Sequence, residues 1–379
     1  MSNWTLRCSA CTRQLPGDKL ASLCPDCSSP LVAQFEGHVP RSAITGAPSL
    51  WRYGAAMPIG PDEAPVSLGE GMTPLLEAPN LARALGLARV WIKDEALNPT
   101  GSFKARGMSA AVTRARALGL RGLVVPTAGN AGAALAAYGA AAQIPTCVVA
   151  PETTPRAILD TIRAFGGELV LIAGHIGDAG KEAVRLATER GLFNVATVRE
   201  PYRVEGMKTM GFEIAEQLEW NLPDAIVYPT GGGEGVIGIW KAIGEMRRWG
   251  WIPDDAPQPK MIVAQAEGCA PLVRALRAGA EKATAWENPQ TSAAGLRVPS
   301  PLGDRLVLRA LRESGGDAES ASEGELNNAM RELAAATGAD AAPEGGCALA
   351  VTRKLVREKR LDASARVVIF NTGSGASYR

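Results

Sequence analysis

Short apolar runs alternate with longer segments of helical periodicity along most of this chain. The runs predict strands at 90–92, 123–125, 147–149, 169–172, 225–228, 262–264 and 367–370. Segments with helical character follow most of them, for example 103–118, 131–142 and 236–248. Such alternation is typical of parallel sheets with helices on both faces. The sequence therefore predicts an α/β fold.

Four cysteines crowd the beginning of the chain in the spacing C-x2-C-x12-C-x2-C, namely Cys8, Cys11, Cys24 and Cys27. Two such pairs can complete a tetrahedral shell of four thiolates around Zn²⁺. Because that shell leaves no open coordination position, the predicted zinc ribbon is structural. Two disulfides, or four thiols without a ligand, are the alternatives.

Composition and charge exclude several classes of function. The 379 residues carry 40 basic and 39 acidic side chains, a formal charge of +1, which argues against a cationic surface for nucleic acid. No apolar run approaches the roughly 18 residues of a membrane span, and residues 1–7 lack the pattern of a signal peptide. We therefore expect a cytoplasmic protein that binds neither nucleic acid nor membrane.

The segment 98–104 follows the first predicted strand and ends at a lysine. In open α/β sheets, ligands bind beyond the carboxyl ends of the strands. Ser102 is expected to cap the next helix and to leave Lys104 in its first turn, where the helix dipole lowers the pKa of a lysine. Such an amine suits a Schiff base, although the pattern also fits an ordinary surface lysine.

The segment 127–132 follows the second predicted strand and opens a helix. Its backbone N–H groups, around Thr127 and Gly129, form a nest suited to a substrate carboxylate. Asn130 can form a hydrogen bond with a ring hydroxyl. A plain strand-to-helix turn capped by asparagine is the alternative.

Two further loops are rich in glycine. The segment 231–235 reads Gly-Gly-Gly-Glu-Gly, and its N–H groups can close around a phosphate at a helix start. The pattern G-x-G-x-x-G at 233–238 is the dinucleotide alternative. The segment 371–375 follows the last predicted strand and offers a hydroxyl to a heteroaromatic nitrogen. Pyridoxal 5'-phosphate needs all four loops, whereas a nicotinamide dinucleotide leaves 98–104 and 127–132 unexplained.

The motifs also resemble those of a known family. Gly-Glu-Gly-Met-Thr-Pro-Leu at 69–75, Tyr-Arg-Val-Glu-Gly-Met-Lys-Thr at 202–209, and the loops that hold Lys104, Asn130 and Gly231 resemble threonine synthase. That family belongs to the fold-type-II, tryptophan-synthase-β-like pyridoxal-phosphate enzymes. The resemblance covers roughly residues 65–379, and some members carry an N-terminal four-cysteine ribbon.

The resemblance implies a role for individual residues. Lys104 matches the Schiff-base lysine, Asn130 the partner of the cofactor's 3'-oxygen, and Arg203 the arginine that binds the substrate phosphate. Thr372 matches the hydroxyl that faces the pyridine nitrogen, with Ser374 in reserve. The phosphate loop corresponds to Gly231, Gly232, Gly233, Glu234 and Gly235.

The implied reaction is γ-elimination of phosphate from O-phospho-L-homoserine, followed by addition of water at Cβ to give L-threonine. The chain departs from the family pattern at four positions. Ala105 stands where the family commonly has aspartate, Ala131 where it has threonine, and Val198 where it has a small polar residue. Glu200 adds a carboxylate nearby. These differences predict weaker contacts to a substrate phosphate. A β-eliminating threonine or serine dehydratase, or a β-replacement enzyme, is the second reading. A nucleic-acid module on a scaffold and a nicotinamide dehydrogenase are the third and fourth.

The resemblance also implies a domain arrangement, with the cofactor in the cleft between two α/β domains. Residues 1–36 form the ribbon, 37–106 and 212–379 the large domain, and 107–211 the small one. Because residues 37–65 hold several prolines and glycines, this segment is expected to be a linker or surface arm that leads into the main body. A homodimer is expected from the family.

Overall fold

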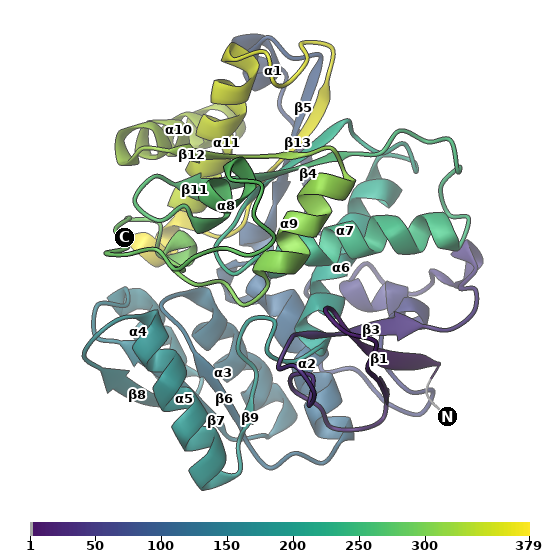
Figure 1. Cartoon of the computed structure of the whole chain (residues 1–379), viewed down its shortest axis with the longest axis vertical. Coiled ribbons are helices and arrows are strands. Elements are labelled where there is room, and N and C mark those ends of the chain that lie inside the picture. Colours follow the sequence, from purple (N-terminus) through teal and green to yellow (C-terminus); the bar gives the residue numbers. More distant parts are fainter. Residues whose placement is uncertain (1–2) are drawn as a thin grey trace.

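Three sheets organise the chain, whose residues 3–379 are described in this computed structural model (Figure 1). A three-stranded antiparallel sheet has the order β2-β1-β3, a six-stranded sheet the order β12-β11-β10-β13-β5-β4, and a parallel four-stranded sheet the order β8-β7-β6-β9. The strands are β1 Trp4–Cys8, β2 Gln14–Pro16, β3 Leu31–Phe35, β4 Leu75–Glu77, β5 Arg89–Asp94, β6 Leu123–Pro126, β7 Thr146–Pro151, β8 Glu168–Ile172, β9 Phe193–Asn194, β10 Ala225–Pro229, β11 Lys260–Ala266, β12 Asp317–Ala321 and β13 Arg366–Asn371.

Helices flank the two larger sheets. They are α1 Pro79–Leu85, α2 Lys104–Ala117, α3 Asn130–Ala142, α4 Arg156–Ala164, α5 Ile176–Arg190, α6 Tyr202–Gln217, α7 Glu234–Arg248, α8 Pro271–Arg277, α9 Asp304–Glu313, α10 Glu323–Thr337 and α11 Pro343–Arg357. Every strand and helix predicted above is present within a few residues, so the α/β fold is confirmed.

The six-stranded sheet is parallel except for β4, which runs antiparallel to β5 at one edge. Successive residues of its central strand β13 enter different cores. Val367 and Ile369 pack with α1, α10 and α11 on one face, while Val368 and Phe370 pack with α7, α8 and α9 on the other. A parallel strand buried on both faces is apolar throughout, which is why continuous apolar runs predicted these strands.

The four-stranded sheet follows the same rule. Val124 of β6 packs against α5, whereas Leu123 and Val125 pack in the core that contains α3 and α4. Helix α3 lies close to the sheet because it is rich in alanine and glycine; a Cβ at Gly139 would stand 2.2 Å from Thr146 Cγ2. In Figure 1 this sheet lies below the six-stranded one. The domain boundaries given above stay a prediction.

A buried ionic cluster joins β5, α2 and α6. The Arg106 guanidinium of α2 donates to Glu95 Oε2 at 2.6 Å and to Glu213 Oε2 at 2.7 Å, and Lys93 Nζ donates to Glu213 at 2.8 Å. All four side chains are fully buried. Burial opposes ionisation of Glu213, but Arg106 and Lys93 outweigh it and hold its pKa at about 2. The cluster therefore fixes α2 against the sheet and against α6.

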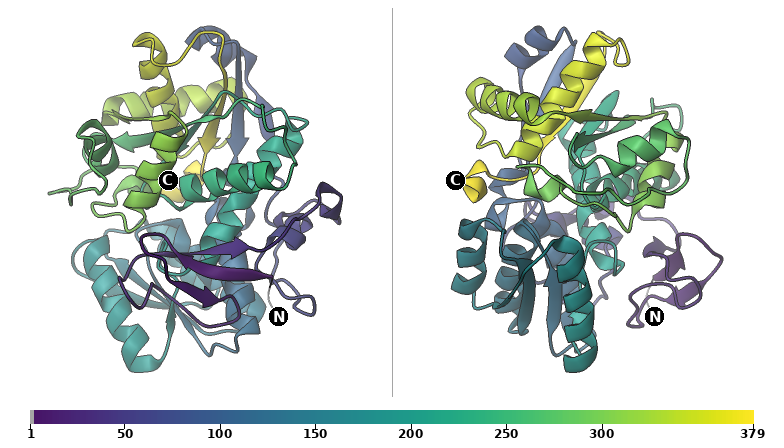
Figure 2. Two further views of the ribbon diagram at one scale, coloured as in Figure 1. Left: turned by 45° about the vertical axis from the view of Figure 1, so that its right-hand side comes forward. Right: turned by 60° about the vertical axis from the view of Figure 1, so that its left-hand side comes forward.

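The small antiparallel sheet packs beside α6 and α7 (Figure 2). Phe35 of β3 makes an edge-to-face contact with Trp249, with ring centroids 6.2 Å apart. Lys208 Nζ of α6 lies 4.2 Å from the Phe35 ring centroid. Aromatic and cation–π contacts of this kind attach the N-terminal unit to the body of the molecule.

The structure differs from the sequence-based predictions at the segment 37–65 and at strand β12. Residues 37–65 are not simply a surface arm, because Leu50, Tyr53 and Met57 are buried and Leu50 and Met57 pack with Ala110 of α2. Strand β12 was missed because its sequence, DAESA, contains no apolar run. No helix within residues 3–379 combines the length and the apolar character of a membrane span.

Candidate functional site

A cavity opens where the carboxyl ends of β10 and β13 meet the first turns of α2, α3 and α7. It brings together Lys104, Asn130, Thr372 and the whole segment 231–235. Lys104 and Thr372 are 268 residues apart in the sequence. All four loops predicted from the sequence border this cavity. The loops 98–104, 231–235 and 371–375 each contribute lining residues, and 127–132 contributes Asn130 alone.

Lys104 is the first residue of α2, and its side chain is 18% exposed. Burial is the main reason that the pKa of Lys104 is lowered; the Arg203 guanidinium lowers it further, while Glu234 opposes both. The expectation of a lowered pKa agrees with this result, but burial rather than the helix dipole is its leading cause. The expected cap was wrong: Ser102 Oγ is buried and has no hydrogen-bond partner among the described residues.

Glu234 connects Lys104 to Arg203. Its Oε1 atom accepts a hydrogen bond from Lys104 Nζ and another from the Arg203 guanidinium at 2.6 Å. Burial raises the pKa of this carboxyl, but Arg203 and Lys104 outweigh it, so the pKa lies below its ordinary value. Glu234 Oε2 is buried without a partner within the described chain. A carboxylate thus stands at the start of α7, beside the amine.

The glycines of the segment 231–235 line the cavity with backbone atoms, because a side chain would not fit at these positions. Gly233 has a φ of +90°, a conformation that L side chains rarely adopt, and a Cβ on it would lie 2.4 Å from Val307 Cγ2. A Cβ on Gly235 would lie 2.2 Å from Tyr228 Cζ. The N–H groups at the start of α7 are thereby left to a ligand, and helix N-termini favour phosphate.

Asn130 and Thr372 take positions on opposite segments of the same cavity. Asn130 begins α3 and is half-buried. Thr372 follows β13 and its side chain makes no hydrogen bond within the described residues. Ser374, the reserve hydroxyl, does not line this cavity; its Oγ bonds to Asp340 instead.

The cavity residues fit pyridoxal phosphate. They combine a lysine of lowered pKa, a backbone cradle whose glycines leave no room for a Cβ, an amide and the Thr372 hydroxyl, which makes no hydrogen bond within the described residues. Glu344 and Tyr378 also line the cavity. Burial raises the pKa of Glu344, whose Oε1 accepts from Gly295 N at 2.8 Å and from the Tyr378 hydroxyl. In the sequence, the motif Glu-Gly-Gly at 344–346 suggested a pocket-lining segment or a helix start, and it lies in the first turn of α11. Nothing in the sequence indicated Tyr378.

A second cavity adjoins the first and shares Lys104, Asn130, Gly232 and Gly295 with it. Thr127 and Gly129, the predicted substrate residues, line this second cavity. Thr127 Oγ1 donates to Gly129 O at 2.7 Å and accepts from Gly129 N at 3.0 Å. The turn is therefore closed by its own side chain.

Arg203 lines neither cavity. Its side chain is fully buried, and besides Glu234 it donates to Val195 O at 2.8 Å. Behind it, Glu200 accepts from Tyr202 N at 2.6 Å and Arg203 N at 3.0 Å. Burial raises the pKa of Glu200 to about 7, although the Arg203 charge and these N–H groups lower it.

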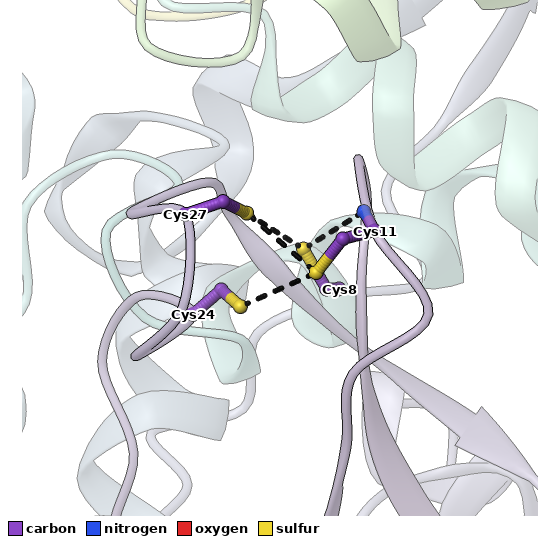
Figure 3. Close-up of side chains that lie close together, drawn as sticks. All are labelled: Cys8, Cys11, Cys24 and Cys27. Carbon is purple, nitrogen blue, oxygen red and sulfur yellow. Dashed lines mark hydrogen bonds between the residues drawn. The ribbon is translucent and has the colours of Figure 1, made fainter.

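The four N-terminal cysteines form one cluster (Figure 3). Their sulfur atoms lie within 4.8 Å of one another, and all four are free thiols. The distances are 3.4 Å between Cys8 and Cys27, 3.7 Å between Cys11 and Cys24, and 3.7 Å between Cys11 and Cys27. A tetrahedron with Zn–S bonds of about 2.3 Å has an edge of about 3.8 Å, so the cluster has the size of a zinc site.

Replacing Glu200 with Gln should remove a pH dependence of stability. The carboxyl titrates near 4.5 when unfolded and at about 7 when folded, so across this window only the folded protein retains the proton. The free energy of unfolding therefore falls as the pH rises, by up to about 3 kcal/mol.

Urea unfolding at about pH 5 and about pH 8 measures this loss in the wild type and in Glu200→Gln. The exposed Glu281→Gln should behave as the wild type. Equal losses of stability in the wild type and Glu200→Gln would contradict the raised pKa.

Comparison with known proteins identifies the family. A family model described as pyridoxal-phosphate dependent enzyme matches residues 66–373. The threonine synthase of Methanosarcina acetivorans is 36% identical over 374 residues, covering 97% of this chain and 91% of that protein. That of Methanocaldococcus jannaschii is 35% identical over 327 residues, covering 86% and 80%.

Among solved structures, maize serine racemase aligns with a TM-score of 0.69 at 21% identity, covering 80% of this chain and 88% of that one. This likeness concerns the fold, which is that of the fold-type-II enzymes. The curated relatives carry the identification further, since their identity extends over most of both chains. This chain belongs to the threonine synthase family of pyridoxal-phosphate-dependent enzymes.

Proposed function

We propose that this protein converts O-phospho-L-homoserine and water into L-threonine and phosphate. The Cγ–O bond breaks and phosphate leaves, protons are removed from Cα and Cβ, water adds a hydroxyl at Cβ, and Cγ and Cα regain protons. The observation that carries the proposal is the cavity in which Lys104 faces the cradle 231–235, in a chain 35–36% identical to threonine synthases.

The residues of the first cavity are proposed to hold the cofactor. Lys104 would bind it covalently, the N–H groups of 231–235 would hold its phosphate, and Asn130 would contact its ring oxygen. When bound, pyridoxal phosphate supplies an electron sink for carbanions next to the imine. Thr372 would offer a neutral hydroxyl to the ring nitrogen, which does not hold that nitrogen protonated as a carboxylate would.

Lys104 is also the proposed base. Because its pKa is lowered by burial, a larger fraction of the amine is neutral near pH 7 than for an ordinary lysine. It lines both cavities, so one amine can reach the cofactor and the substrate. Glu234, which accepts from Lys104, gives the ammonium form a nearby counterion while it carries a proton.

Elimination of ammonia from threonine or serine is the second candidate. It is favoured by one observation, the burial of Arg203 against Glu234, which leaves this arginine outside both cavities. A reaction without a phosphorylated substrate does not need that side chain.

The products separate the two candidates. With O-phospho-L-homoserine, the purified holoenzyme should release phosphate and L-threonine in equal amounts. With L-threonine, it should release neither ammonia nor a 2-oxo acid at a comparable rate. Lys104→Ala should lower the rate by about 10²–10⁴-fold or more, because it removes both the covalent link and the base.

Lys181→Ala is the matched control, since this lysine is 83% exposed on α5, and it should keep the wild-type rate. Ammonia released from threonine without any phosphate from O-phospho-L-homoserine would replace the first proposal by the second.

We also propose that Cys8, Cys11, Cys24 and Cys27 bind one structural Zn²⁺. The supporting observations are the four free thiols and their spacing, which matches a tetrahedral thiolate shell. Zinc would tie together the two loops that hold the cysteine pairs. The buried residues of this sheet, such as Leu6 and Phe35, pack in a core that they share with the body of the molecule. Ser22, between the cysteine pairs, donates to Arg199 O at 2.7 Å, so the ribbon touches the wall of the second cavity.

Cys24→Ser is expected to lower the zinc content from about one to about zero per chain and the Tm by about 5 °C or more, because binding energy of a structural zinc is folding energy. Metal analysis and calorimetry measure these changes. Cys147→Ala, at a cysteine outside the cluster, should keep its zinc. A wild-type protein prepared with zinc present that holds no metal would contradict the proposal.

A further inference from the structure

The second cavity is positively charged. Three cationic side chains line it, Lys104, Arg199 and Arg297, and no Asp or Glu is among its described lining residues. Arg199 lies in the turn before α6, and Arg297 follows the short helix η5, Ala294–Leu296. The two arginines thus come from different segments that border the same space.

Neither guanidinium is neutralised by the protein. Arg199 and Arg297 are half-buried, yet within residues 3–379 their side chains make no ion pair and no hydrogen bond. The carboxylate next in sequence to Arg199, that of Glu200, is turned to the N–H groups at the start of α6. Two unpaired guanidinium groups beside one cavity attract an anion, and each can bind a phosphate by two hydrogen bonds.

The turn that carries Arg199 is held in a strained conformation. Val198 has a φ of +59°, which is unfavourable for a β-branched residue. Both backbone polar groups of Arg199 form hydrogen bonds: Arg199 N donates to Ala196 O at 3.0 Å, and Arg199 O accepts from Ser22 Oγ at 2.7 Å. Strain that the surrounding structure maintains is found where function requires a particular position.

Arg203, which the family resemblance implied would bind the substrate phosphate, makes other contacts in the structure. Arg203 is fully buried, is paired with Glu234 and lines neither cavity. Ala131 lines the second cavity but offers no hydroxyl, and Val198 is buried. Apart from Lys104, which is paired with Glu234, the cationic side chains among the described lining residues of the second cavity are Arg199 and Arg297.

We propose that Arg199 and Arg297 together bind the anionic group on the side chain of the amino-acid substrate, and that they set the preference of this enzyme for a phosphorylated substrate over its neutral analogue. This inference rests on the proposed function, since it concerns the same site. The N–H groups of Thr127 and Gly129 are already bonded within the protein. The first turn of α3, whose Asn130 and Ala131 line the same cavity, is left for the α-carboxylate. The substrate class is an amino acid with a phosphate ester beyond Cβ.

A pair of unreactive ligands tests the proposal on the holoenzyme. One is the phosphonate in which a methylene replaces the bridging oxygen of O-phospho-L-homoserine; the other is L-norvaline, which lacks the phosphonate. Calorimetry gives the Kd of each ligand for the wild type, Arg199→Gln, Arg297→Gln and the double variant. Arg305→Gln is the control, because Arg305 is an exposed arginine on α9 that lines neither cavity.

The wild type and Arg305→Gln should bind the phosphonate at least about tenfold more tightly than norvaline. Each single variant should raise the Kd for the phosphonate by about 10–100-fold, as expected for loss of a charge-assisted contact, and leave the Kd for norvaline within about threefold. The double variant should lose the preference. Inorganic phosphate should compete with the phosphonate in the wild type and in Arg305→Gln, but not in the double variant.

A preference that survives in the double variant overturns the inference, and so does a wild type that binds both ligands equally. Parallel loss of affinity for both ligands overturns it too, because it indicates a structural role. If the preference is lost as expected but O-phospho-L-homoserine releases no phosphate, the two arginines are anion-binding residues and the proposed reaction is wrong. The two failures are thus distinguishable.

Discussion

The buried ionic cluster around Arg106 is the interaction on which the arrangement of the site depends. It joins the strand β5, the helix α2 that begins at Lys104, and the helix α6 that begins next to Arg203. Glu95 and Glu213 each tolerate complete burial because the same guanidinium lies between them. A buried charge that loses its partner costs about 3–5 kcal/mol, so α2 and α6 are constrained to one relative position.

A second chain of charges follows from that position. With α2 and α6 fixed, Lys104 and Arg203 both reach Glu234 at the start of α7. Glu234 accepts from the amine and from the guanidinium beside the first cavity, and the backbone of 231–235 lines that cavity. Arg203 is thereby committed to the interior, and the second cavity is left with Arg199 and Arg297 as its guanidinium groups. The charges of Lys104, Arg203 and Glu234 are thus paired with one another, whereas Arg199 and Arg297 face the second cavity.

The sequence predicted the parts of the fold that local burial determines. Strands buried on both faces are continuous apolar runs, so β6, β7, β10, β11 and β13 were predicted. Strand β12 was not, because its buried Glu319 is balanced by Arg277, Lys354 and Arg360, which are distant in sequence. The pattern of apolar residues within one segment cannot indicate ion pairs with residues that are distant in sequence.

The same distinction holds for the site. Lys104, Asn130 and 231–235 lie in loops after strands, where topology alone brings residues together. The pairing of Arg203 with Glu234 and the arrival of Tyr378 beside Glu344 are side-chain contacts between segments 31 and 34 residues apart. These contacts depend on the packing of α6, α7 and α11, so no local pattern predicted them.

The proposed function requires that one particular amine, that of Lys104, carries pyridoxal phosphate. Borohydride reduction of the holoprotein, followed by proteolysis and peptide mass spectrometry, tests this directly. We expect a phosphopyridoxyl group on the peptide that contains Lys104 and on no other lysine. A reduced cofactor found on a different lysine, or a protein that takes up no cofactor at all, would contradict it.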